Sequence, residues 1–372
     1  MKTINILVPV DMNYFVSALT AMTSLVVSND GRDKIVFHYA WEKADDNVQN
    51  VITKAMSRFP NVEIIFYRLD LSFLKNHKQI SYAPPSLMPY ARLLAGRFLP
   101  ASVERILYLD SDILVMRDVS ELFDIDMKGK AVMAAPGHYQ YKQTPYAVGV
   151  PFYSPAPSDD ATYFNAGVLL IDMNQWRIYQ SKFEEVLHSF DPRLLVHLDQ
   201  TVLNYVLINK IGRLDRCWNF WADHCRAEPD SILHFIGPDK PWKANGTGRA
   251  VKLWRIFFKR HVECFLPKHC KAEFESKWKE ITPVRPRPPL KKRPLRPALS
   301  MISPRLLNEI LGLLSPGRTV ERKAADLENL KKKRQEFIPK NNARASDSFA
   351  VKIRLWFRWR LAILRMFLTR KQ

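Results

Sequence analysis

Predominantly apolar segments that alternate with helical patterns constrain the fold of this chain most strongly. The segments at residues 4–10 and 34–41 (INILVPV and KIVFHYAW) lack the polar alternation of a strand with one solvated face, and residues 62–69 (VEIIFYRL) are predicted to form a third strand. Strands buried on both faces are typical of parallel sheets that helices cover on both sides. The segments at 14–28 and 47–59, which follow the first two, have helical spacing. The pattern therefore predicts an α/β fold with a mostly parallel sheet.

The next part of the chain continues this alternation. A helix is predicted at residues 88–99 (MPYARLLAGRFL) and another at 196–208 (VHLDQTVLNYVLI). Four further strands are predicted where apolar runs are bounded by turn residues, at 105–115, 130–136, 164–173 and 231–237.

Charge divides the sequence into unequal parts. Residues 281–372 hold 23 Lys and Arg against 6 Asp and Glu, which is +17 of the net charge of +20. We therefore predict a nearly neutral globular domain at 1–280. Residues 281–345 are rich in proline and basic residues and are predicted to form a linker with short helices. A strongly basic region of this kind favours an anionic partner.

The last segment, residues 346–372, is predicted to form a basic amphipathic helix. On a helical wheel Arg354, Arg358 and Arg365 share one narrow stripe. The wide apolar arc contains Trp356, Trp359, Ile363, Met366 and Phe367. Such a helix is expected to lie on an anionic membrane surface rather than to cross the bilayer. The alternative is a helix that docks on the protein's own core.

The remaining sequence signals favour a reducing compartment. The first residues (MKTINILVPVDMNYF) lack the pattern of a secretory signal peptide, and no run of about 18 uncharged apolar residues occurs. Cys217, Cys225, Cys264 and Cys270 have the spacing of neither a CxxC pair nor a disulfide framework. We expect reduced thiols, with a zinc site that includes nearby histidines as the alternative. The expected location is cytoplasmic, peripheral on the cytoplasmic face of the inner (plasma) membrane.

Two carboxylates interrupt the apolar run at 105–115. Asp110 and Asp112 are separated only by Ser111. Residues i and i+2 of a strand point to the same face, so two carboxylates at a strand end are able to converge on one cation. Carboxylate oxygens suit Mn²⁺ or Mg²⁺, and ligands bind at the carboxyl ends of strands in open α/β sheets. We therefore predict a metal site, with a simple Asp-Ser-Asp turn as the alternative.

Six segments occur together in one order and resemble the family 8 glycosyltransferases. They are DMNY (11–14), YARL (90–93), YLDSDILV (108–115), YFNAGVLLID (163–172), LDQTVLN (198–204) and HFIGPDKPW (234–242). The resemblance implies the GT-A fold of nucleotide-diphospho-sugar transferases, a Rossmann-like mixed sheet, over roughly residues 3–280. It also implies transfer with retention of anomeric configuration. Within the family the sequence is most similar to bacterial lipopolysaccharide-core α-galactosyl- and α-glucosyltransferases.

The resemblance assigns roles to residues at matching positions. It implies a Mn²⁺ or Mg²⁺ site made of Asp110, Asp112 and His234. It implies donor-binding roles for eight residues, which are Asp11, Asn13, Tyr14, Arg92, Ser111, Asn165, Gly237 and Lys240. Of these, the first three would contact the nucleoside, whereas Gly237 and Lys240 would hold the diphosphate.

The implied catalytic residues are Gln200 and Asp199. Gln200 would lie beside the reacting carbon of the sugar, where a double displacement requires a nucleophile. An amide is a poor nucleophile, so front-face attack is the more economical route, with the leaving phosphate as proton acceptor. If a covalent route exists, Asp199 is the best available carboxylate.

The sequence thus predicts an enzyme that moves galactose or glucose from a UDP-sugar to a glycolipid, with lipopolysaccharide core as the expected acceptor, and forms an α-linkage. One alternative is a nucleotidyltransferase, which would bring a Gly-rich phosphate loop that residues 8–15 lack. Another is a nucleic-acid- or membrane-binding protein on an inactive GT-A fold. We expect no nucleic-acid partner, because the basic residues concentrate outside the nearly neutral domain.

Overall fold

The structure, a computed structural model, describes residues 1–29, 31–74, 86–140, 162–189, 195, 197–222, 230–237, 240–243 and 248–272. The chain divides into two units, Met1–Glu280 and Ile281–Gln372, and every described residue belongs to the first. The predictions for residues 281–345 and 346–372 therefore lie outside the described residues. In the described part no helix is both long and apolar enough to cross a membrane.

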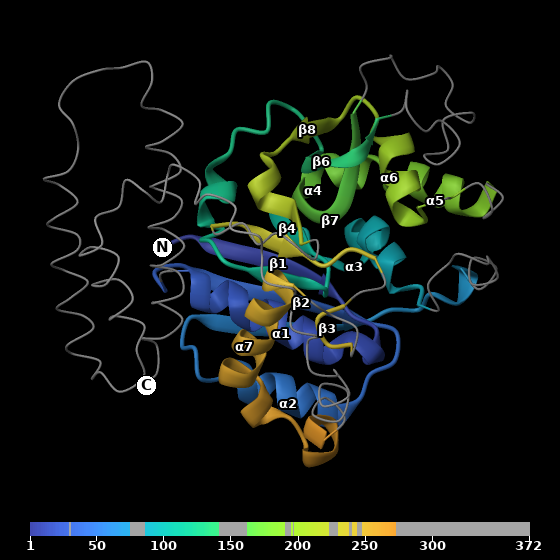
Figure 1. Cartoon of the computed structure of the whole chain (residues 1–372). Helices are drawn as coiled ribbons and strands as arrows, with labels where there is room; N and C mark the ends of the chain where they lie inside the picture. Colours follow the sequence, from blue (N-terminus) through green and yellow to red (C-terminus); the bar gives the residue numbers. More distant parts are fainter. Residues whose placement is uncertain are drawn as a thin grey trace, which may run out of the picture. The chain divides into compact units, whose positions relative to one another are not determined.

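A seven-stranded mixed sheet forms the centre of the first unit, with strand order β3-β2-β1-β4-β7-β6-β8 (Figure 1). Its strands are β1 (Thr3–Pro9), β2 (Lys34–Trp41), β3 (Val62–Arg68), β4 (Arg105–Leu109), β6 (Val132–Gln140), β7 (Thr162–Asp172) and β8 (Ile211–Arg213). Strands β1 to β4 pair in parallel, whereas β7 is antiparallel to both β4 and β6. The predicted α/β fold with a mixed sheet is confirmed.

Helices cover both faces of this sheet. The α-helices are α1 (Phe15–Ser28), α2 (Asp46–Met56), α3 (Ala95–Phe98), α4 (Met173–Ile178), α5 (Gln180–Ser189), α6 (Asp199–Val206) and α7 (Arg249–His261). Short 3₁₀ helices are η1 (Met12–Tyr14), η3 (Met88–Leu94), η4 (Ser120–Asp124), η7 (Arg216–Asn219) and η8 (Glu263–Phe265). Figure 1 shows α1, α2 and α7 together on one side of β1–β3, with α5 and α6 on the other.

Local sequence explains why the first elements form. From Ile35 to Trp41, strand β2 is apolar apart from His38 and is buried, as a strand between two helical layers must be. Helix α2 begins at Asp45, whose carboxylate accepts a hydrogen bond from the Val48 backbone N–H and so caps the helix. The apolar core on the α5–α6 side of the sheet includes the fully buried Trp176.

Two predicted elements differ from the structure. The helix predicted at 88–99 is instead η3 followed by the single turn α3, and Pro89 stands in the first turn of η3. The strand predicted at 105–115 is two strands, β4 and β5 (Ile113–Val115). Strand β5 belongs to a second, three-stranded sheet with β10 (Ile232–His234) and β9 (Phe220–Trp221).

The order of the strands locates a ligand site. From β1 the chain proceeds outward to β2 and β3, and then returns to place β4 on the other side of β1. In open α/β sheets such a reversal leaves a crevice at the carboxyl ends of the two central strands. Asp11 follows the end of β1 and Asp110 follows the end of β4, so both lie at the carboxyl ends of the two central strands, where such folds bind ligands.

Candidate functional site

Asp110 and Asp112 lie where the chain leaves the large sheet for the small one. The Asp110 backbone N–H donates to the Gly167 carbonyl at 2.8 Å, and the chain then bends through Ser111 before β5 begins. Because the bend follows immediately, the two carboxylates do not stand on one regular strand as the sequence analysis assumed. Both side chains are still brought to the same place, with 26% of Asp110 and 14% of Asp112 exposed.

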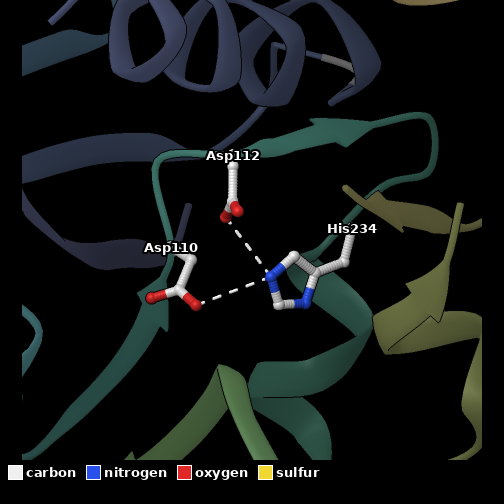
Figure 2. Close-up of side chains that lie close together, drawn as sticks. All are labelled: Asp110, Asp112 and His234. Carbon is white, nitrogen blue, oxygen red and sulfur yellow. Dashed lines mark ion pairs between the residues drawn. The ribbon is translucent and has the colours of Figure 1, made fainter. Parts of the chain in front are cut away.

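His234 reaches the two aspartates through strand pairing. Strand β10 is antiparallel to β5, with His234 opposite Ile113, and the Phe235 backbone N–H donates to the Asp112 carbonyl at 2.9 Å. The imidazole Nε2 lies 3.3 Å from Asp112 Oδ1 and 3.6 Å from Asp110 Oδ2 (Figure 2). The predicted grouping of these three residues is therefore present in the structure.

These three side chains fit a divalent cation. One ligand atom from each residue lies within 4.8 Å of the others, and the donor set is two carboxylates and one imidazole. Oxygen ligands with one imidazole suit Mn²⁺, and the carboxylates also suit Mg²⁺. Among the described residues this is the one group of three or more His, Cys, Asp and Glu side chains with such spacing.

Lys240 stands beside the same site. Its Nζ lies 2.5 Å from Asp112 Oδ2 and 2.6 Å from the Phe235 carbonyl, and the residue is buried. Burial raises the pKa of Asp112, but His234 and Lys240 outweigh this, so that pKa lies well below its usual value. Gly237 precedes Lys240 with φ of +84°, a backbone conformation that favours glycine.

The lack of a side chain at Gly167 makes room for the metal ligands. A Cβ atom there would lie 2.1 Å from His234 Cε1 and 3.0 Å from Asp110 Oδ2. Real Cβ atoms do not approach other atoms that closely, so any larger residue displaces a ligand. In the sequence this glycine is visible only as part of the matching segment YFNAGVLLID, which does not reveal its role.

Arg92 holds the aspartates from within the core rather than from the surface. Its guanidinium lies 2.8 Å from Asp110 Oδ1 through Nη2 and 2.8 Å from Asp199 Oδ2 through Nε. It also donates to the carbonyls of Pro89 and Ala166, and only 3% of the residue is exposed. In this structure the arginine expected to bind the donor contacts internal partners through Nε, Nη1 and Nη2.

Asp199 and Gln200 begin α6, after a backbone conformation that is rare for a residue with a side chain. Leu198 has φ of +54°, and strain of this kind is concentrated at functional sites. Burial raises the pKa of Asp199 to about 7, although the adjacent Arg92 opposes the shift. Gln200 Oε1 accepts hydrogen bonds of 3.0 Å from both Asn165 Nδ2 and the Ala166 backbone N–H.

The residues predicted to contact the nucleoside lie directly beyond β1. Asp11 Oδ1 accepts hydrogen bonds from the backbone and side-chain nitrogens of Asn13 at 2.9 and 2.8 Å. The Tyr14 ring meets Trp242 edge to face, with ring centroids 5.6 Å apart. Trp242 thereby connects the end of β1 to the segment that carries Lys240. Ser111 is half-buried between the two aspartates.

Asn219 is a site residue that the sequence analysis missed. It is 4% exposed at the end of η7, and its Oδ1 lies 2.8 Å from His234 Nδ1 while its Nδ2 lies 2.7 Å from Asn165 Oδ1. The only sequence signal was an amide between aromatic residues in CWNF, which is too short to assign a partner.

The sequence of residues 5–246 matches the profile of glycosyl transferase family 8. The chain belongs to this family. "Probable galacturonosyltransferase-like 4" from Arabidopsis thaliana is 29% identical over 260 residues, which are 64% of this chain and 73% of that protein. "Lipopolysaccharide 1,3-galactosyltransferase" from Salmonella typhimurium (strain LT2) is 26% identical over 260 residues, 65% of this chain and 74% of that protein.

Solved structures agree with this family assignment. The galactosyltransferase LgtC, in complex with donor and acceptor sugar analogs, superposes with a TM-score of 0.61 at 20% identity. The match covers 73% of this chain and all of that one, and at this identity it establishes the fold alone. The predicted resemblance to family 8 glycosyltransferases with the GT-A fold is thus confirmed, and a lipopolysaccharide galactosyltransferase is among the relatives.

Proposed function

We propose that this family 8 glycosyltransferase moves a hexose, galactose or glucose, from a UDP-sugar to a glycolipid hydroxyl with retention, forming an α-linkage. Lipopolysaccharide core is the proposed acceptor class. The observation that carries the proposal is the group of Asp110, Asp112 and His234 at the crevice between β1 and β4, with Lys240 beside it. The lipopolysaccharide galactosyltransferase among the relatives supports the donor and acceptor class.

The diphosphate is the most highly charged part of such a donor. A bound Mn²⁺ or Mg²⁺ would stabilise the negative charge that the diphosphate gains as the bond to the sugar breaks. Asp110, Asp112 and His234 would hold that cation. Lys240 is near enough to add a second positive charge, and Gly237, whose φ is positive, would contact the diphosphate through its backbone. Asp11, Asn13 and Tyr14 would bind the nucleoside at the end of β1.

The surroundings of the sugar site favour front-face transfer over a covalent intermediate. Gln200 Oε1, the amide's nucleophilic atom, is already occupied by two hydrogen-bond donors. Asp199 is buried and paired with Arg92, which leaves it poorly placed as a mobile nucleophile. In the front-face route the leaving phosphate takes the acceptor's proton, while Asn165 and Gln200 position the sugar.

Slow hydrolysis of the donor in the absence of acceptor tests the enzyme class. UDP-galactose, UDP-glucose and UDP-galacturonate would be supplied separately, with Mn²⁺ or with EDTA. We expect UDP release from one of the two neutral hexose donors, dependent on metal and lost in Asp112→Ala. The matched control is Asp46→Ala, which changes an exposed aspartate in the first turn of α2. No release from any donor by folded protein would overturn the proposal, and selective use of UDP-galacturonate would overturn its hexose class.

Membrane association is the second part of the proposal. The protein is proposed to be peripheral on the cytoplasmic face of the inner membrane, held through the basic segment at 346–372. Three arginines on one stripe and a wide apolar arc support this reading. Binding of the full chain to liposomes with and without anionic lipid is the test, with Arg354, Arg358 and Arg365 replaced by Glu in the variant. Equal binding by variant and wild type would contradict the proposal, as would a preference for DNA over anionic liposomes.

A further inference from the structure

Three side-chain amides join the proposed metal site to the proposed sugar site. His234 Nδ1 lies 2.8 Å from Asn219 Oδ1, and Asn219 Nδ2 lies 2.7 Å from Asn165 Oδ1. Asn165 Nδ2 in turn lies 3.0 Å from Gln200 Oε1. The two asparagines and the histidine are each at most 9% exposed, so water does not readily substitute for a lost partner.

We call this hydrogen-bonded series of four side chains the amide relay (His234, Asn219, Asn165 and Gln200). Two backbone N–H groups determine how its amides are oriented. The Gly167 N–H donates to Asn165 at 2.9 Å, so the atom that it meets must be the acceptor Oδ1. The Ala166 N–H donates to Gln200 in the same way and fixes Oε1. Because Asn165 Oδ1 is an acceptor, the Asn219 atom that faces it must be the donor Nδ2.

The orientation of Asn219 then determines the state of the imidazole. With Nδ2 turned to Asn165, only the carbonyl oxygen of Asn219 remains to face His234, and it accepts a hydrogen bond. The proton must therefore be on His234 Nδ1. In the neutral ring this leaves the lone pair on Nε2, the atom that faces Asp110 and Asp112.

We propose that Asn219 is a positioning residue for the glycosyltransfer reaction, with one function at each end of its amide. Its Oδ1 holds His234 in the tautomer that can bind a metal through Nε2. Its Nδ2 holds Asn165, and through Asn165 the amide of Gln200, at the sugar site. The inference rests on the proposed metal-dependent function, and it adds that one residue aligns both halves of the site.

Two substitutions separate these functions. Asn219→Asp keeps an oxygen that accepts from His234 Nδ1 but removes the N–H that donates to Asn165. Asn219→Ala removes both. Asn204→Ala is the matched control, because Asn204 is a fully buried amide whose hydrogen bonds go to the Phe164 backbone and the Gln200 carbonyl rather than to His234.

The first measurement reads the histidine directly. Long-range ¹H–¹⁵N NMR of ¹⁵N-histidine-labelled full chain, with EDTA and at alkaline pH, reports which ring nitrogen carries the proton. The His234 signals are identified by their loss in His234→Gln. We expect the Nδ1–H tautomer in wild type, Asn219→Asp and Asn204→Ala, and a mixture of tautomers in Asn219→Ala. The Nε2–H tautomer in wild type, or no change in Asn219→Ala, would overturn the inference.

The second measurement is Mn²⁺ binding, followed by electron paramagnetic resonance, together with the rate of UDP-sugar hydrolysis at saturating Mn²⁺. Loss of a hydrogen-bond partner behind a metal-binding histidine typically lowers affinity about 10- to 100-fold, which we expect for Asn219→Ala. Asn219→Asp is expected to retain Mn²⁺ affinity but lose hydrolysis rate. If Asn219→Ala and wild type bind Mn²⁺ with equal affinity, the role of Asn219 is overturned but the proposed function is not. If wild type binds no Mn²⁺, both the role of Asn219 and the proposed metal-dependent function are overturned.

Discussion

Lys240 and Asp112 form a largely buried ion pair, in which Nζ lies 2.5 Å from Oδ2. A metal cation at Asp112 would compete with this ammonium for the same carboxylate. The diphosphate of a donor would offer the lysine a new anionic partner. Metal and donor are therefore expected to bind more favourably together than either does alone.

Lys240→Met tests this competition. Removing the ammonium frees the Asp112 carboxylate from this ion pair, so Mn²⁺ affinity is expected to rise. Hydrolysis of the UDP-sugar is expected to fall, because the diphosphate loses a positive charge. Titration with Mn²⁺ and the hydrolysis assay measure the two effects. Lys243→Met, at an exposed lysine of the same segment, serves as the control. A fall in Mn²⁺ affinity in Lys240→Met would contradict the expectation.

Gly167→Ala is expected to damage the metal site while the fold persists. The new methyl group would overlap the His234 ring, so Mn²⁺ affinity should fall at least about tenfold. Thermal unfolding and Mn²⁺ binding are measured on the same samples. In the control Gly96→Ala, the added Cβ meets only the flexible side chains of Gln180 and Arg177. Unchanged Mn²⁺ affinity in Gly167→Ala would show that the close approach is not required.

Arg92→Met is expected to destabilise the domain strongly. It leaves Asp110 and Asp199 without their shared guanidinium, and breaking a buried pair in this way costs about 3–5 kcal/mol. Urea unfolding in the presence of EDTA measures the cost without a metal contribution. Arg97→Met removes the partner of Glu184, but the Arg97 side chain is 60% exposed, so its cost should stay below about 1 kcal/mol. Similar costs for the two variants would refute this reading.

His38 is expected to make the domain sensitive to acid. Burial lowers the pKa of His38 to about 4, although Glu63 opposes the shift. Its stabilising contribution is therefore complete above the unfolded-state pKa of about 6.5 and is lost as the pH falls toward 4, by about 3 kcal/mol. In His38→Gln, the free energy of urea unfolding should therefore fall by about 3 kcal/mol less than in wild type as the pH is lowered from 6.5 to 4. Tyr67→Phe, which keeps the imidazole, should show the same decline as wild type, and parallel declines in all three proteins would contradict the prediction.

The sequence predicted most of the large sheet because burial on both faces leaves a clear apolar pattern, as in residues 34–41. The same apolar pattern made the prediction wrong at residues 105–115. An apolar run continues through β4 and β5, but these strands belong to different sheets, and the bend at Asp110–Asp112 carries the charges out of the core. The apolar pattern indicates only that residues are buried, and it does not separate β4 from β5 because both strands are buried.

Site residues were predicted where their side-chain type itself indicates a function. They were missed where the function depends on contacts with residues distant in the sequence. Two carboxylates have few roles inside a core, so Asp110 and Asp112 stood out, whereas His234 was assigned through the family resemblance. Asn219 and Gly167 act through partners that only the pairing of β9 with β10 and of β4 with β7 brings near. Such long-range pairings leave no trace in local spacing.

The amide relay also bears on how this site tolerates mutation. The orientation of its amides is determined by the backbone N–H groups of Ala166 and Gly167. Every amino acid except proline supplies such an N–H group. Replacing a side chain in the relay removes one member but leaves both reference points in position. The loss of Asn165 or Gln200 is therefore open to repair by another residue able to accept from the same backbone N–H groups. A change that moves β7 itself cannot be repaired in this way, because it displaces the two backbone N–H groups that orient the amides.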